Sequence, residues 1–94
     1  MPLEPLELLA LDSCVQSPEA PLTVRAEFES FLGCTVTEIE VREAFTQLVA
    51  LGFAEIDSRG PHSHPNDAWF YATPAGRAAV DREWDIVFPD VRGR

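Results

Sequence analysis

Residues 37–52 constrain the fold most, because they carry signals for both ends of a helix together with its buried face. Thr37 and Glu40 have the spacing of a capping box, in which the threonine oxygen accepts from the Glu40 amide and the glutamate reaches back. Apolar side chains then recur at helical spacing, namely Val41, Ala44, Phe45, Leu48 and Val49. Gly52 follows where a left-handed residue ends a helix. The segment therefore predicts an amphipathic helix with Phe45 and Leu48 in the core.

Two further helices are predicted before this one. Residues 4–15 have Pro5 in the first turn, where a missing N–H has no cost. The apolar side of this helix comprises Leu8, Leu9, Leu11 and Val15. Thr23 is placed to cap a second helix over residues 23–32, and Gly33 to end it. Its apolar stripe comprises Val24, Phe28, Phe31 and Leu32.

A hairpin and a last helix are predicted after residue 52. Residues 53–57 alternate apolar and polar side chains, and residues 69–73 are rich in aromatic, β-prone types. The segment between them is polar and rich in Gly and Pro, as expected for a long hairpin tip. Thr73 and Pro74 then have the types favoured at the N-cap and first position of a helix. Its apolar positions are Gly76, Val80, Trp84 and Val87.

Charge excludes more functions than any other part of the composition. Sixteen acids and seven bases, all of them arginine, give the chain a net charge of −9. Residues 1–57 hold eleven of the acids and two of the arginines, and so carry the whole net −9. A surface that binds nucleic acid needs bases to displace phosphate counterions. We therefore expect this part of the chain to repel a phosphate backbone.

The order of three helices, a hairpin and a helix is that of a winged helix. Residues 37–55 resemble the recognition helix and first wing strand of this superfamily. Residues 70–77 resemble the second wing strand entering the last helix in bacterial regulators of the PadR and MarR types. The resemblance covers about residues 4–84. It implies an α+β fold with a three-helix core, a two-stranded wing and a C-terminal helix, forming one domain over residues 1–94 with an extension at 85–94. It also implies that the third helix enters the DNA major groove.

The predicted third helix departs from that pattern on its solvent face. Helical spacing turns Ile39, Glu40, Glu43, Thr46, Gln47 and Ala50 outward. Helices that read DNA usually offer Arg, Lys, Asn or Gln to base edges, and Gln47 is the only such residue on this face. Arg42 lies nearer the core edge, among acidic neighbours. This face predicts protein binding rather than DNA binding.

We expect a small acidic regulatory or adaptor module that binds a protein with a basic surface. One variant of this hypothesis is that the acidic face mimics DNA and occupies a DNA-binding protein. The contact candidates are Glu27, Glu29, Glu38, Glu40, Glu43 and Gln47. The simpler alternative for any one of these glutamates is a solvated surface charge. The rival hypothesis is a DNA-binding transcriptional regulator, which would use Arg42, Thr46, Gln47 and Arg59.

Three other kinds of site are weighed and not favoured. His62, His64 and Asp67 supply fewer ligands than the four of a closed zinc site, so we expect a solvated turn and no metal. Cys14 and Cys34 lack the spacing of a redox pair and are expected to be small buried residues. The chain has no phosphate-binding glycine loop or hydrolase motif, and its length leaves little room for a deep pocket. We expect no enzymatic activity and no cofactor.

The remaining expectations concern location and assembly. No stretch approaches the ~20 apolar residues of a membrane span, and the N-terminus lacks the regions of a signal peptide, so a cytoplasmic protein is expected. Residues 69–71 are consecutive aromatics, so one face of their strand packs inward and the other is either a contact surface or covered. The apolar run at 84–88 either supports a homodimer through the C-terminal helix or folds back on its own core.

Overall fold

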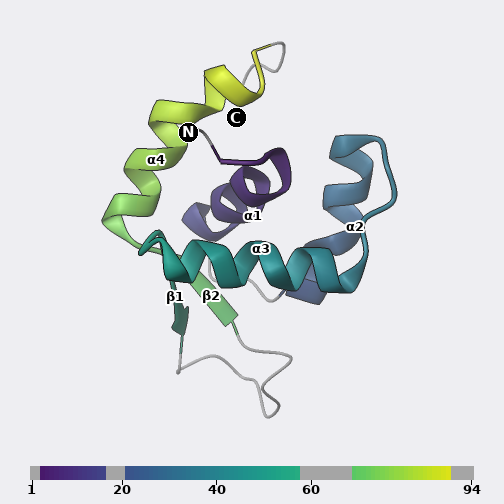
Figure 1. Ribbon diagram of the computed structural model, residues 1–94, viewed down its shortest axis with the longest axis horizontal. Coiled ribbons are helices and arrows are strands. Elements are labelled where there is room, and N and C mark those ends of the chain that lie inside the picture. Colours follow the sequence, from purple (N-terminus) through teal and green to yellow (C-terminus); the bar gives the residue numbers. More distant parts are fainter. Residues whose placement is uncertain (1–2, 17–20, 58–68, 90–94) are drawn as a thin grey trace.

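The computed structural model describes residues 3–16, 21–57 and 69–89. Three helices come first, α1 (Pro5–Gln16), α2 (Pro21–Leu32) and α3 (Glu38–Ala50). An antiparallel hairpin of β1 (Ala54–Asp57) and β2 (Trp69–Ala72) follows, and α4 (Pro74–Val87) comes last (Figure 1). The fold is α+β, with its elements in the predicted order. The predicted hairpin tip lies outside the described residues.

The third helix begins and ends as its sequence indicates. The hydroxyl of Thr37 accepts a hydrogen bond from the Glu40 N–H at 3.1 Å, and the Glu40 carboxylate accepts one from the Thr37 N–H at 3.1 Å. Both halves of the capping box are therefore formed. At the other end Gly52 has a φ of 79°, in the left-handed region that glycine adopts without strain.

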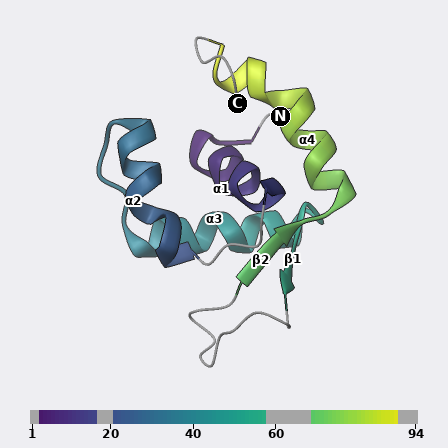
Figure 2. The ribbon, with the colours of Figure 1, turned by 180° about the vertical axis from the view of Figure 1, so that it is seen from behind.

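The start of α4 is fastened to the end of α3. Thr73 caps α4, as predicted, by accepting from the Gly76 N–H at 3.1 Å, and its own hydroxyl donates to the Gly52 carbonyl at 2.7 Å. Gly76 lies so close to the Phe53 carbonyl that a Cβ there would come within 2.0 Å of the oxygen. Only glycine allows this approach. The hairpin and α4 consequently leave the same end of α3 (Figure 1, Figure 2).

The second helix starts two residues earlier than predicted. It begins at Pro21, so Thr23 lies inside the helix and the predicted N-cap at Thr23 is wrong. Proline is well suited to a first helical position, because its fixed φ fits the helix and its missing N–H has no partner to lose. The predicted end is confirmed, since Gly33 has a φ of 70° and its N–H bonds to the Glu29 carbonyl at 2.9 Å.

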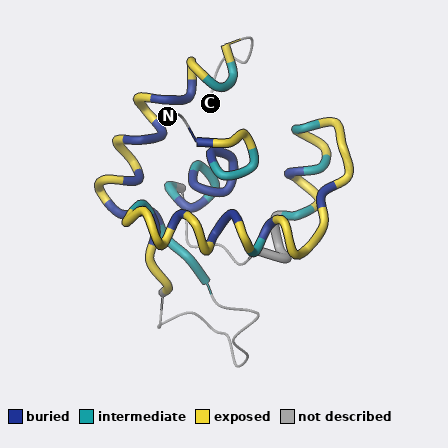
Figure 3. Tube along the Cα trace, in the orientation of Figure 1, coloured by how far each residue is buried: buried dark blue, intermediate teal, exposed yellow. Residues whose placement is uncertain are grey.

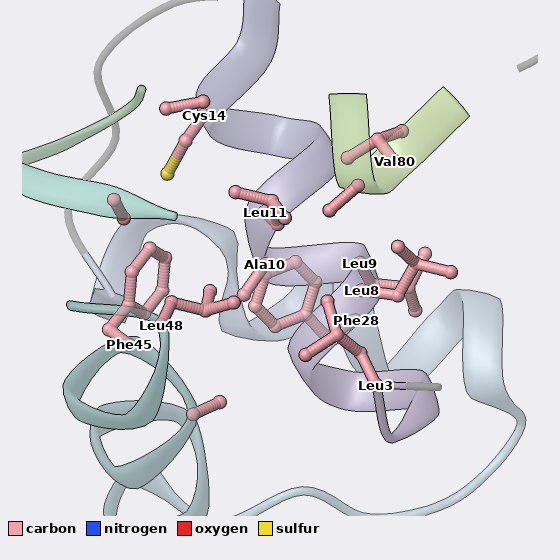
Figure 4. Close-up of a cluster of buried hydrophobic side chains, with 14 of the residues drawn as sticks. Leu3, Leu8, Leu9, Ala10, Leu11, Cys14, Phe28, Phe45, Leu48 and Val80 are labelled. Carbon is pink, nitrogen blue, oxygen red and sulfur yellow. The ribbon is translucent and has the colours of Figure 1, made fainter. Parts of the chain in front are cut away.

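The core surrounds α1, which packs against the other three helices and β2. Residues 8–11 are all buried, so α1 is enclosed on most sides rather than on one stripe (Figure 3). Figure 4 shows Phe45 and Leu48 of α3 pointing into this cluster. Both are fully buried, as predicted. The ring of Phe45 lies against that of Phe70 in β2, with centroids 4.8 Å apart.

Two residues assigned to buried faces are exposed. Val49 is 37% exposed, because it lies at the edge of the buried face of α3, which comprises Val41, Ala44, Phe45 and Leu48. Phe31, at the end of α2, is 45% exposed and packs edgewise on the rings of Trp84 and Phe88 at 6.2 and 5.3 Å. Phe31 therefore still contacts the apolar rings of α4 and the residue after it, whereas the prediction that Val49 lies on the buried face is wrong.

The aromatic side chains of the hairpin are partly buried, and those at the end of α4 are buried or partly buried. Glu55 pairs with Tyr71, and the tyrosine hydroxyl donates to the Glu55 carboxylate across the strands. Trp84 is buried, and Val87 and Phe88 are partly buried against the core, so the C-terminal run folds back in this structure. Within the described ranges, no helix has both the length and the apolarity to cross a membrane.

Candidate protein-binding surface

The exposed face of α3 is the surface that the sequence assigns to partner binding. Its six predicted members, Ile39, Glu40, Glu43, Thr46, Gln47 and Ala50, are all exposed. None of them is basic. Gln47 is therefore the one side chain of this face with the chemistry that usually reads base edges.

The single base of α3 is engaged by a neighbour on the same helix. Arg42 lies 2.6 Å from Glu38 through its Nη2 and donates from its Nε to the same carboxylate at 2.9 Å. The residues are four positions apart, which places them on one side of the helix. A phosphate would have to displace Glu38 to reach Arg42, so this DNA-contact candidate and this protein-contact candidate largely neutralise each other.

Two of the candidate glutamates hold the fold. Glu40 forms the capping box described above. Glu29 accepts from the Val36 N–H at 2.9 Å, while Arg25 donates to the Val36 carbonyl at 2.7 Å. Val36 is buried, so its backbone groups need such partners. This role was not predicted, because no local pattern shows that two side chains of α2 reach the turn before α3.

Glu27 and Glu43 fit a contact role best among the candidates. Both are exposed, and neither forms a hydrogen bond or ion pair with any residue in the described ranges. Gln47 is likewise exposed and unpaired there. Glu27 is on α2, whereas Glu43 and Gln47 share the exposed side of α3.

A groove of about 650 Å³ lies where the first turns of α1, the turn between α2 and α3, and the first half of α3 meet. Its lining residues are Glu4, Pro5, Leu6, Glu7, Leu32, Cys34, Thr35, Val36, Glu40, Glu43, Ala44 and Gln47. This volume falls within the ~300–1,000 Å³ range of ligand sites, but the groove is open rather than an enclosed, deep pocket. The lining residues that the structure describes include four carboxylates and no base.

The acidic side of the groove includes two residues from the start of α1, Glu4 and Glu7. Glu7 accepts from the Glu4 N–H at 2.9 Å, and the Glu4 carbonyl accepts the first helical hydrogen bond of α1 from Leu8. Glu4 is therefore the N-cap of α1, which begins at Pro5, and Pro5 lies in the first turn as predicted. Because α1 and α3 approach each other in space, their first turns bring Glu4 and Glu7 to the same groove as Glu40 and Glu43.

The segment that carries Glu4 is anchored to α4 by a buried carboxylate. Leu3 donates from its N–H to Glu83 at 2.6 Å, and Arg82 pairs with the other oxygen of Glu83 at 2.7 Å. Burial raises the pKa of Glu83, but the Leu3 hydrogen bond and the Arg82 guanidinium outweigh it and hold that pKa below its ordinary value. Glu83 is thus charged at neutral pH and fixes the entry to α1.

The other predicted sites are only partly described. Cys14 is buried as expected, but Cys34 is exposed, and the expectation that it is buried is wrong. The thiol lies in the turn that follows the end of α2, at the side of the groove, where no element covers it. Arg59, His62, His64 and Asp67 lie outside the described residues. Among the residues described, no group of three or more His, Cys, Asp or Glu is placed to hold a metal ion.

Comparison with known proteins does not add an assignment. The chain matches no protein-family model, and no curated protein sequence matches it significantly.

Proposed function

We propose that this chain is a winged-helix protein, resembling bacterial regulators of the PadR and MarR types, which acts as an acidic regulatory or adaptor module. The element order supports the assignment, with α3 as the recognition helix and β1 and β2 as the wing. The close approach of Gly76 to Phe53 is consistent with it, because it joins the wing directly to the last helix.

The exposed face of α3 carries the proposal that the partner is a protein. Glu43 extends from this face without a partner in the described structure, while Arg42 is bound to Glu38. Carboxylates beside phosphates weaken every backbone contact, and counterion release requires bases. A basic protein surface has the complementary charge. DNA mimicry is one form of this proposal, in which the basic surface is that of a DNA-binding protein.

A second proposal is that two copies of the chain associate through α4, and it concerns only part of that helix. Trp84 is buried and Phe88 packs on Phe31, whereas Ile86 is 62% exposed. A homodimer through this helix would therefore use Ile86 rather than the whole apolar run.

An experiment with two arms tests the proposal. In the first, the chain is mixed with random-sequence duplex DNA at low salt, and mobility shift measures binding. In the second, the immobilised chain captures proteins from an extract of its native cell, and mass spectrometry identifies those released by salt. We expect no retarded duplex and a salt-released protein with a basic surface.

One result would overturn the proposal in favour of the rival regulator. Specific, salt-sensitive binding to a defined duplex in the range of about 10⁻⁸–10⁻¹¹ M is typical of true operators. If the chain bound DNA in this way and substitution of Thr46 or Gln47 relaxed the sequence preference, α3 would be a DNA-reading helix.

A further inference from the structure

The groove between α1 and α3 is amphipathic. Leu6, Leu32 and Ala44 supply apolar surface to it, and Val36 is buried at its side. Glu4, Glu7, Glu40 and Glu43 supply the charge. A groove of this volume can hold a few side chains of a peptide. Its lining offers apolar surface to an apolar side chain and carboxylates to a basic one.

The four carboxylates of the groove differ in what they are free to do. Glu7 and Glu40 accept backbone hydrogen bonds at the starts of α1 and α3, so their positions are fixed by the fold. The side chains of Glu4 and Glu43 have no such bond to any described residue. Each fixed carboxylate is therefore accompanied by a free one, which can turn toward a ligand without breaking a helix cap.

Among the described residues, no base lines the groove. Arg25 donates to the carbonyl of Val36, a lining residue, and Arg42 pairs with Glu38, so neither of these arginines pairs with a groove carboxylate. Uncompensated carboxylates in a concave surface focus a negative potential and attract cations. They also exclude phosphate, so a nucleic acid does not fit.

We infer that this groove seats a basic segment of a partner protein, with an arginine or lysine at Glu4 and Glu43 and an adjacent apolar side chain on Leu6, Leu32 and Ala44. The inference rests on the proposed protein-binding function and gives it a location. Long basic side chains suit both parts of the site, because their methylene stems lie on apolar surface while the charged end reaches a carboxylate. A purely apolar segment would leave the carboxylates of the lining without a partner, and an acidic segment would be repelled by them.

Two matched double variants test the location. Glu4→Gln with Glu43→Gln removes the two free charges of the groove. Glu55→Gln with Asp85→Asn removes two exposed charges that do not line it and makes the same change in net charge. The side chains of Glu4, Glu43 and Asp85 have no partner among the described residues, and Glu55→Gln keeps an oxygen that can accept from the Tyr71 hydroxyl, so both proteins should melt within a few degrees of the parent.

The probe is a short fluorescein-labelled peptide in which arginine and leucine alternate, followed by fluorescence anisotropy at low salt. We expect the groove variant to bind it about tenfold more weakly than the parent, as the loss of two exposed ion pairs would cause, and the control variant to bind within about twofold. Peptides with glutamate for arginine, or serine for leucine, should bind more weakly to the parent. A fluorine tag on the exposed Cys34 should shift its resonance as the peptide saturates.

The failures of the two proposals are distinguishable. If both double variants weakened the peptide equally, the peptide would be responding to net charge, and the groove would be excluded as its seat. If the peptide did not bind at all while the chain still captured a basic protein, the groove inference would fail and the proposed function would stand. If neither occurred, both would fail.

Discussion

Glu83 shows how a single residue can be charged and buried without destabilising the fold. It is 6% exposed, and an isolated carboxylate at that depth would be costly. Leu3 and Arg82 each supply a donor within 2.7 Å of one of its oxygens. The charged form is therefore favoured over the protonated form, and the N-terminal segment is held against α4 as a result.

The lowered pKa of Glu83 predicts a pH dependence of stability. A carboxyl whose pKa is lower in the folded chain stabilises the fold fully above its unfolded value. That contribution is lost as pH falls below the ordinary 4.5 and through the lowered pKa. Glu83→Gln should thus unfold more easily than the parent at pH 7, and the difference should shrink as the pH falls below 4.5. Urea unfolding over this range measures it.

Asp85→Asn serves as the control, because Asp85 is an exposed acid on the same helix. Its difference from the parent should stay small at every pH. A constant difference between Glu83→Gln and the parent across the range would show that Glu83 acts through shape rather than through charge.

At the scale of elements, the turn between α2 and α3 depends on side chains from α2. Glu29 and Arg25 lie four positions apart on α2 and satisfy the N–H and the carbonyl of the buried Val36. Two side chains of α2 therefore hold both backbone groups of Val36, and we call this pair of contacts the clamp. This clamp sets where α3 starts, and with it the position of the capping box and of the groove.

Glu29→Ala should destabilise the chain by about 1–3 kcal/mol, because it leaves the buried N–H of Val36 without an acceptor. Glu27→Ala, an exposed substitution two residues away, should stay within about 0.5 kcal/mol of the parent. Chemical denaturation of both variants provides the measurement. Equal effects of the two substitutions would contradict the clamp.

The start or end of a helix could be predicted where the residues that determine it lie within a few positions of one another in the sequence. The capping box at Thr37, the glycines after α2 and α3, and the cap at Thr73 are each set within a few residues, and all are confirmed. The start of α2 was missed because Pro21 and Thr23 offer competing local signals.

The candidate site depended on contacts that no local pattern contains. Exposure of Glu43 and Gln47 follows from helical spacing and was predicted correctly. The pairing of Glu29 with Val36 joins residues seven apart, and the groove joins Glu4 to Glu43 across the fold. Such contacts arise only when separate elements pack together, so no local pattern in the sequence predicts them. Cys34 was misjudged for the same reason.

The whole molecule carries its charge unevenly. Residues 1–57 hold the entire net −9, and they include α2, α3 and the first helical turn of α1. The described bases of this part are both bound within the fold. A basic partner would therefore be attracted over a distance of about one Debye length, roughly 8 Å at physiological ionic strength, before any contact forms.

This electrostatic attraction predicts whether reversing a charge changes the rate of association or the rate of dissociation. Glu43→Lys should slow association with a basic partner several-fold and leave dissociation less affected, because charges at the edge of an interface act mainly on encounter. Glu43 is preferred over Glu40 for the substitution, since Glu40 belongs to the capping box. Surface plasmon resonance on the captured partner measures both rates.

Asp85→Lys makes the same change in net charge on α4, away from the acidic face, and separates local from global effects. It should slow association less than Glu43→Lys, and high salt should abolish the difference between the two variants, because screening removes the field that distinguishes them. If the two variants slowed association equally, the total charge of the chain would be responsible. If Glu43→Lys instead left the partner unaffected and the parent bound a defined duplex, the face of α3 would belong to DNA, and its carboxylates would serve to reject wrong sequences rather than to attract a protein.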